Sequence, residues 1–376
     1  MTDICNELSE RLMDCAEACD LAAVLSLLAQ GADPRADGSQ ALSFAAAHGH
    51  AECVELLIPV SDPKAFKSRT LGIAAYNGHA ECVRLLIPES DPKELSSTAL
   101  NFAAKRGHAE CVKLLIPVSD PKAADSAALA SASEAGHAEC VKLLIPVSDP
   151  KARNSAALGM AAQAGKAECL KLLIPASDPK ANHSAALGWA AMNGHIDCVK
   201  LLIPVSYTKE LSSIALCFAA RGGHVDCVNA LIPVSNSKAD KSMALCAAAE
   251  HGRAECVKLL IPVCDPKDDN SAALRYAALN GHAECFKLLI PVSAPLIEID
   301  AILIDALRDG HVSIILAILS EAPSLLDQID LPASLEAAVD EGNSELESLL
   351  RSIIEKKALG DYVSARAAPT QKTSRL

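Results

Sequence analysis

The sequence predicts an all-α solenoid, and three observations carry that prediction. Glycine recurs every 29 residues from Gly49 to Gly281, and a cysteine follows it at a constant offset from Cys53 to Cys285. Apolar residues in each repeat follow two short helical patterns, one on either side of the glycine. About half of the chain is apolar, yet aromatic residues make up only 3%, which suits closely packed helices. A repeat this short cannot bury its own apolar face, so neighbouring repeats are expected to stack.

The first helix of the repeat is bounded by a serine and a glycine. The repeat reads S-x-A-L-x-x-A-A-x-x-G-H-A-E-C-V-K-L-L-I-P-V-S-D-P-K-A-x-x. Ser39 is expected to N-cap this helix by accepting a bond from an orphan backbone N–H group. Leu42 and the two alanines at i+3 and i+4 share one face. Gly49 stands where a C′ residue in the left-handed conformation would end the helix.

The second helix of the repeat is short and ends at a proline. Its predicted buried side consists of Cys53, Val54, Leu56, Leu57 and Ile58. Pro59 has no N–H group with which to continue the helix, and the Ser-Asp-Pro that follows favours a turn. Helices shorter than about 12 residues are marginal alone. Stability is therefore expected to come from packing between repeats.

These motifs resemble those of a known family. The stretch S-x-A-L-x-x-A-A-x-x-G-H-x-x-x-V-x-L-L resembles the ankyrin repeat, whose pattern is T-P-L-H-x-A-A-x-x-G-H-x-x-x-V-x-L-L-L. Residues 27–36, LLAQGADPRA, look like the family's L-L-x-x-G-A-D-V-N-A. The resemblance extends over roughly residues 10–320. It implies an ankyrin-type helical solenoid of about 10–11 two-helix repeats.

The repeat departs from the ankyrin pattern in two respects. Ankyrin repeats run at about 33 residues, and the four that are missing here fall between the second helix and the next first helix. Ankyrin repeats build a β-hairpin finger there, so the fingers are expected to be short or absent. The T-P-L-H turn is replaced by S-x-A-L, which removes that histidine and its turn-bracing hydrogen bonds.

The repeat pattern predicts four segments along the chain. Residues 1–38 form an N-terminal capping repeat, 39–299 hold the nine 29-residue repeats, and 300–355 hold degenerate C-terminal repeats. Residues 356–376 are expected to be disordered because they are too polar to bury.

Composition bears on the partners and the compartment. The net charge of −13 disfavours binding to nucleic acid, which needs a basic face. No signal peptide and no run of 18 apolar residues is visible, and we expect a monomer in the cytoplasm. Fifteen cysteines without an export signal favour a reducing compartment. The terminal Ser374-Arg375-Leu376 resembles a peroxisomal address and also a PDZ-type ligand, both weaker alternatives.

The recurring His-x-x-Cys pair is the obvious candidate for chemistry. A closed zinc site needs four ligands, and each repeat offers two. Neighbouring copies should stand about 8–10 Å apart, beyond the roughly 7 Å Cα limit for a disulfide. Lys166 and Arg253 replace the histidine while the cysteine stays. We therefore expect a core thiol and a histidine that braces the turn between the two helices, with no catalytic residue, metal or cofactor.

Partner recognition is expected at the positions that differ between repeats. They flank the Ala-Ala pair of the first helix, and the ankyrin resemblance places them on the concave groove. Aromatic, Met and Arg side chains are typical of interface cores. Packing between repeats is the competing interpretation for each aromatic. The predicted partner-binding residues are Phe44, Tyr76, Phe102, Lys105, Arg106, Trp189, Met192, Asn193, Tyr207, Phe218, Arg221, Arg275, Tyr276 and Leu279.

Five of these residues are predicted to form the hot spot. They fall in two adjacent repeats where the Ser-Asp-Pro motif is also broken, and they are Trp189, Met192, Tyr207, Phe218 and Arg221.

The sequence thus predicts a non-enzymatic scaffold that binds a partner protein. One alternative within this class is an effector exported to modulate host proteins. A thiol-rich metal or redox buffer is an alternative of a different class, because the cysteines are many.

Overall fold

A computed structural model describes residues 2–206, 209–235, 243–293, 311–321, 331–340 and 342–367. The chain divides into two units, Met1–Tyr207 and Thr208–Leu376, each of which is considered by itself. No strand occurs in these ranges, and helices follow one another in pairs. The predicted all-α solenoid is confirmed, and the described linkers contain no β-hairpin finger.

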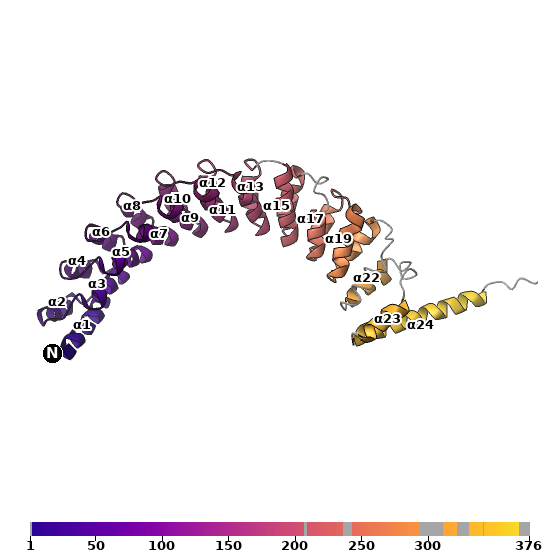
Figure 1. Cartoon of the computed structure of the whole chain (residues 1–376), viewed down its shortest axis with the longest axis horizontal. Helices are drawn as coiled ribbons and strands as arrows, with labels where there is room; N and C mark the ends of the chain where they lie inside the picture. Colours follow the sequence, from indigo (N-terminus) through magenta and orange to yellow (C-terminus); the bar gives the residue numbers. More distant parts are fainter. Residues whose placement is uncertain are drawn as a thin grey trace, which may run out of the picture. The chain divides into compact units, whose positions relative to one another are not determined.

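Unit 1 consists of two rows of helices. In Figure 1 the first helices of the repeats lie on the inner side of the curve of this unit, and the second helices lie on its outer side. Each first helix packs on the first helix of the next repeat. The first helices are α1 (Thr2–Glu17), α3 (Ala36–His48), α5 (Ala65–Asn77), α7 (Glu94–Arg106), α9 (Ala123–Ala135), α11 (Ala152–Gln163) and α13 (Ala181–Met192). The second helices are α2 (Leu21–Ala29), α4 (Ala51–Leu57), α6 (Ala80–Leu86), α8 (Ala109–Leu115), α10 (Ala138–Leu144), α12 (Ala167–Leu173) and α14 (Ile196–Leu202), with a 3₁₀ turn, η1 (Ile87–Glu89), after α6.

Unit 2 has the same pairing of first and second helices. Its last three helices are longer than its second helices. Its first helices α15 (Lys209–Gly222), α17 (Met243–Glu250) and α19 (Asp268–Leu279) pack in series. The second helices are α16 (Val225–Leu231), α18 (Ala254–Leu260) and α20 (Ala283–Leu289), with 3₁₀ turns η2 (Ile232–Val234) and η3 (Ile290–Val292). The last helices are α22 (Val312–Glu321), α23 (Leu331–Asp340) and α24 (Ser344–Ala367).

Helix α24 corrects the prediction for the C-terminal tail. Residues 356–367 were expected to be disordered, but the helix continues through them to Ala367. Lys356, Lys357 and Ala358 are strong helix formers and extend a helix that already began at Ser344. Residues 368–376 lie outside the described ranges.

The core is built from the residues that recur in every repeat. The cysteines of the second helices, from Cys53 to Cys285, are at most 1% exposed. The leucine and the Ala-Ala pair of the first helices are buried beside them, with Ser133 in the place of one alanine. Phe286 stands where the other repeats have valine or, at Leu170, leucine, and it is also buried. Small side chains at the Ala-Ala positions let adjacent first helices approach closely.

A left-handed turn lies at the start of each first helix from α3 to α13 and takes the place of the hairpin finger. In α5 the φ angles of Phe66, Lys67 and Ser68 are 48°, 60° and 53°, so the right-handed helix begins only after the serine. The same three positive φ angles occur at the start of α3, α7, α9, α11 and α13. Few L-residues adopt this conformation readily.

The serine does not N-cap its own helix, and that prediction is wrong. Ser68 Oγ accepts a hydrogen bond from the backbone N–H of Asp91 in the next repeat, at 2.9 Å. An N-cap residue needs extended backbone angles, which the left-handed serine does not have. The Asp91 carboxylate in turn accepts from the N–H of Lys93 at 3.0 Å, so both polar groups stabilise the linker.

The glycine ends its helix as predicted, but the histidine does not brace its own turn. Gly49 has a φ of 79°, and the N–H of His50 donates to Ala45 O, as in a Schellman motif. His79 Nε2 instead bonds the carbonyl of Ala47, in the preceding repeat, at 2.9 Å. The His79 ring lies where a Cβ on Gly49 would stand. Glycine is therefore needed both for its conformation and for the space that the next histidine occupies.

Candidate functional site

The predicted partner-binding residues lie on or directly after first helices, mostly with exposed side chains. Those exposed to solvent are Tyr76, Phe102, Lys105, Arg106, Trp189, Met192, Asn193, Arg221 and Tyr276. Those half-buried between repeats are Phe44, Phe218, Arg275 and Leu279. Tyr207 lies outside the described residues. The prediction that these residues contact a partner is not tested by their exposure and stays a prediction.

Three of these residues meet on α5 and α7. The rings of Tyr76 and Phe102 stand edge to face with their centroids 5.7 Å apart. The Arg106 guanidinium lies over the Tyr76 ring, 4.9 Å from its centroid. Such a pairing holds the guanidinium in place through the ring quadrupole while its N–H groups stay available. The result is an exposed surface that is both aromatic and cationic.

A hollow of about 270 Å³ adjoins this surface between the N-terminal ends of α5 and α7. Phe66, Leu95 and Phe102 supply large apolar side chains to its lining, and Lys67 and Arg69 supply charge. Sequence reasoning missed Phe66 and Leu95, because their linker was interpreted only as a shortened finger. The signal was present: the equivalent residues of five other repeats are Asp37, Ala124, Arg153, Asn182 and Asp269.

A second hollow, of about 180 Å³, lies between α11 and α13. Trp189 is one of its lining residues. The Trp189 ring lies against Gly159, where a Cβ would come within 3.0 Å of Trp189 Cε3. Met192 is exposed one turn further along α13. The Asn193 amide donates to Trp189 O at 2.8 Å, so this side chain satisfies the end of its own helix. Asn193 therefore has a structural role at the end of α13 in addition to the partner contact that was predicted for it.

Of the three remaining hot-spot residues, Tyr207 lies outside the described residues, and Phe218 and Arg221 lie in unit 2, where they border a third hollow. It measures about 350 Å³ and is lined by Phe218, Arg221, Met243, Glu250 and Tyr276 together with Cys217, Cys246 and Ala247. Neither Arg275 nor Leu279 is among its lining residues. Because Trp189 and Met192 belong to unit 1, the joint hot spot proposed from the sequence stays a prediction.

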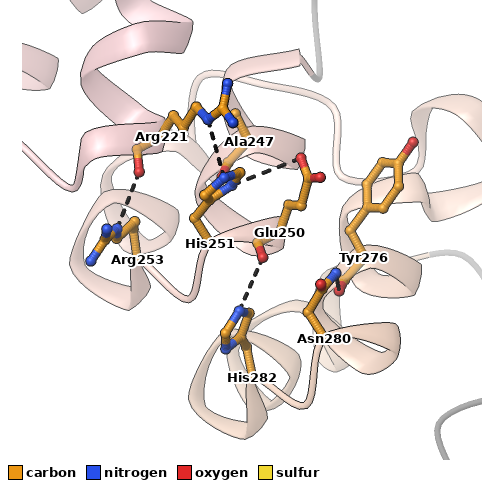
Figure 2. Close-up of polar contacts among 8 residues, drawn as sticks. All are labelled: Arg221, Ala247, Glu250, His251, Arg253, Tyr276, Asn280 and His282. Carbon is orange, nitrogen blue, oxygen red and sulfur yellow. Dashed lines mark hydrogen bonds and ion pairs between the residues drawn. The ribbon is translucent and has the colours of Figure 1, made fainter. Parts of the chain in front are cut away.

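Polar contacts fix Arg221 at the edge of this hollow, as Figure 2 shows. Arg221 Nε donates to His251 Nε2 at 3.1 Å, and His251 Nδ1 lies 3.1 Å from Ala247 O. Because a carbonyl only accepts, Nδ1 carries the proton and Nε2 offers its lone pair to Arg221. The guanidinium is thus oriented by the His251 ring, and Glu250 Oε2 lies 3.8 Å from His251 Nδ1.

The recurring cysteines are neutral thiols in the core. Burial raises the pKa of Cys111, Cys140 and Cys198 to about 11, far from a thiolate at neutral pH. In the part of the chain that the structure describes, no group of three or more His, Cys, Asp or Glu side chains could hold a metal ion. One thiol contact was not anticipated: Cys19 Sγ, in the place of a repeat glycine, lies 3.9 Å from Cys53 Sγ.

None of the described helices combines the length and the apolar character needed to cross a bilayer.

Comparison with known proteins agrees with the geometry. A family model described as ankyrin repeats (3 copies) matches residues 12–94, 71–154, 129–213, 216–302 and 245–328. A comparison with curated proteins finds no match. Stacked two-helix repeats, glycine-ended first helices and family matches over most of the chain lead to one conclusion: the chain belongs to the ankyrin repeat family.

Proposed function

We propose that the protein is a non-enzymatic scaffold that binds a partner protein on the concave row of first helices. Ankyrin repeats are protein-interaction modules, and the chain is built of them along most of its length. One observation carries the proposal. The recurring leucine, alanine and cysteine side chains are buried, while large side chains that differ between repeats, such as Tyr76, Trp189 and Tyr276, are exposed on first helices.

The separation between buried recurring side chains and exposed variable ones favours binding of a partner. Stacking of repeats uses the recurring leucine, alanine and cysteine, so an exposed aromatic adds little to it. Aromatic, Met and Arg side chains dominate the energetics of protein interfaces when a partner desolvates them. Hollows beside Phe102, Trp189 and Phe218 would receive side chains of the partner. We further propose that the scaffold acts as a cytoplasmic monomer.

The thiol-buffer alternative has less support. A metal or redox buffer needs accessible thiolates, and the recurring cysteines are buried with raised pKa values. An exported effector would use the same interaction surface, so it differs in where the partner resides and not in the mechanism of binding.

The scaffold is tested by affinity capture with three full-length proteins. These are the wild type, the variant Trp189→Ala/Phe218→Ala/Arg221→Ala, and a control variant Lys142→Ala/Lys200→Ala on second helices. We expect the triple variant to lose captured proteins that the control retains, because hot-spot truncations cost about 2 kcal/mol or more each. Equal capture by all three proteins would refute the predicted hot spot. If the wild type captured no protein, the proposed scaffold function would be refuted.

A further inference from the structure

Phe66 and Leu95 are large apolar residues that have a left-handed backbone conformation and are exposed to solvent. Both features are unfavourable for such residues. Their φ angles are 48° and 47°, in the left-handed region that bulky residues rarely adopt. Their side chains are 64% and 54% exposed. The same position holds Asp37 and Asn182 in other repeats, so the repeat as such does not require an apolar residue there, although the Phe66 ring also lies against Gly38 of the preceding repeat.

The two side chains border the hollow between α5 and α7, with Phe102 at its side. Gly72 faces Phe102, and a Cβ there would stand 3.7 Å from the Phe102 ring. The volume of about 270 Å³ is below the roughly 300–1,000 Å³ of small-molecule pockets. It is therefore suited to one or two large side chains of a peptide rather than to a metabolite.

The hollow is lined by two cationic side chains, Lys67 and Arg69, and by two carboxylates, Asp91 and Glu94, while Lys105 and Arg106 add positive charge further along α7. In the described part of the chain no carboxylate lies within 4.0 Å of the cationic groups of Lys67, Arg69, Lys105 and Arg106. The acids at the hollow are already engaged. Asp91 accepts from the N–H of Lys93 at 3.0 Å, and Glu94 accepts from Ser68 Oγ at 3.2 Å.

We propose that this surface, the α5–α7 patch, binds an acidic peptide segment of the partner that carries a large apolar side chain. The patch comprises Phe66, Lys67, Arg69, Tyr76, Leu95, Phe102, Lys105 and Arg106. The apolar side chain enters the hollow, and carboxylates of the peptide pair with the ammonium and guanidinium groups. The inference rests on the proposed scaffold function and specifies its partner.

A peptide fits these observations better than another polyanion. The net charge of −13 repels a nucleic acid backbone outside the patch, whereas a short acidic segment contacts only the patch, where four cationic side chains outnumber the carboxylates of Asp91 and Glu94. The cation–π contact of Arg106 with Tyr76 orients a planar fork that suits carboxylates. The hollow then adds an apolar anchor that charge alone does not provide.

Binding of synthetic peptides to the full chain tests the proposal by fluorescence anisotropy. Three labelled peptides of equal length are compared: one with Asp and Glu alternating with Phe and Leu, one with Ser in place of the apolar residues, and one with Lys in place of the acids. We expect the first to bind at least about 10-fold more tightly than the others and to weaken with salt. A single-stranded oligonucleotide and anionic lipid vesicles serve as competitors.

Two patch variants and one matched control locate the binding. Phe66→Asn/Leu95→Asn removes the apolar side chains and suits the left-handed backbone, as Asn182 already does at this position. Lys105→Glu/Arg106→Glu reverses two charges, and Lys142→Glu/Lys200→Glu makes the same charge change on α10 and α14. We expect each patch variant to weaken the first peptide by about 10-fold or more and the control by no more than about 2-fold. Melting curves by circular dichroism check that all variants fold.

Each result decides the proposal. It is overturned if the wild type binds none of the peptides, if the three peptides bind alike, if both patch variants bind like the control, or if the oligonucleotide or vesicles bind more tightly. A failure of the scaffold itself would look different. In that case the wild type would also capture no partner in the affinity experiment, whereas failure of the patch alone leaves capture by the wild type intact.

Discussion

Replacing Gly107 by alanine perturbs the contact that joins one repeat to the next. Gly107 has a φ of 80°, and a Cβ there would stand 2.5 Å from His137 Nδ1. The left-handed conformation costs an alanine about 1–2 kcal/mol. Displacing the ring also breaks the 3.1 Å bond between His137 Nε2 and Lys105 O, worth about 0.5–1.5 kcal/mol. Together the expected loss in the free energy of unfolding is about 2–3 kcal/mol.

A double-mutant cycle separates the two contributions. His137→Ala alone should cost about 1 kcal/mol, because it removes the same hydrogen bond without changing the backbone. In Gly107→Ala/His137→Ala that bond can be lost only once, so the double variant should cost about 1 kcal/mol less than the sum of the single variants. His137→Arg should retain most of the stability, since Arg253 Nε makes the equivalent bond to Arg221 O at 3.1 Å.

Urea unfolding of the full chain, followed by circular dichroism at 222 nm, measures these differences. The midpoint shift at a constant slope m gives the change in stability, and a changed slope would reveal partial unfolding of the array. Gly72→Ala is the internal control, because Gly72 is helical and its nearest neighbour would lie 3.7 Å from the new Cβ. Alanine there should be neutral or stabilise by up to about 1 kcal/mol. A role for the Gly107–His137 contact is refuted if Gly107→Ala changes the free energy of unfolding no more than Gly72→Ala does. Strict additivity of the double-mutant cycle would refute it as well.

Two further predictions concern the linker serine and the buried thiols. Ser126→Ala should cost about 1–3 kcal/mol in urea unfolding, because the N–H of Asp149 loses its acceptor at 2.9 Å, and an unchanged midpoint would refute a role for the bond. Burial raises the pKa of Cys140 from 9.0 to about 11, so the native thiol stays protonated while the unfolded one ionises. The stability that this thiol contributes is therefore present below pH 9 and is lost as pH rises from 9 towards 11, and Cys140→Ala should flatten that decline. Native thiols should also react slowly with a disulfide reagent at pH 8, and rapid labelling of Cys140 would contradict this.

Local patterns in the sequence were sufficient for much of the fold. The spacing of Leu71, Ala74 and Ala75 predicts one helix face, and these residues are buried. Gly78 predicts a left-handed helix end, and its φ is 85°. Such signals are readable because a helix is specified by residues three or four apart and ended by the next few.

Candidate site residues were only partly accessible in this way. The sequence indicates that Tyr76, Phe102 and Arg106 vary between repeats, but their mutual contact depends on how far α5 and α7 approach each other. Phe66 and Leu95 were not among the predicted site residues, because their exposure depends on a left-handed turn that no local sequence pattern predicts.

The period, the two helices of each repeat and their buried faces can be predicted from the sequence, because each depends on residues close together in the chain. Which polar groups meet depends on how the repeats stack. Ser68 serves Asp91, and His79 serves Ala47, each in a different repeat. A hydrogen bond goes to whichever unsatisfied group stacking brings within about 3 Å, and stacking is a property of the assembled array.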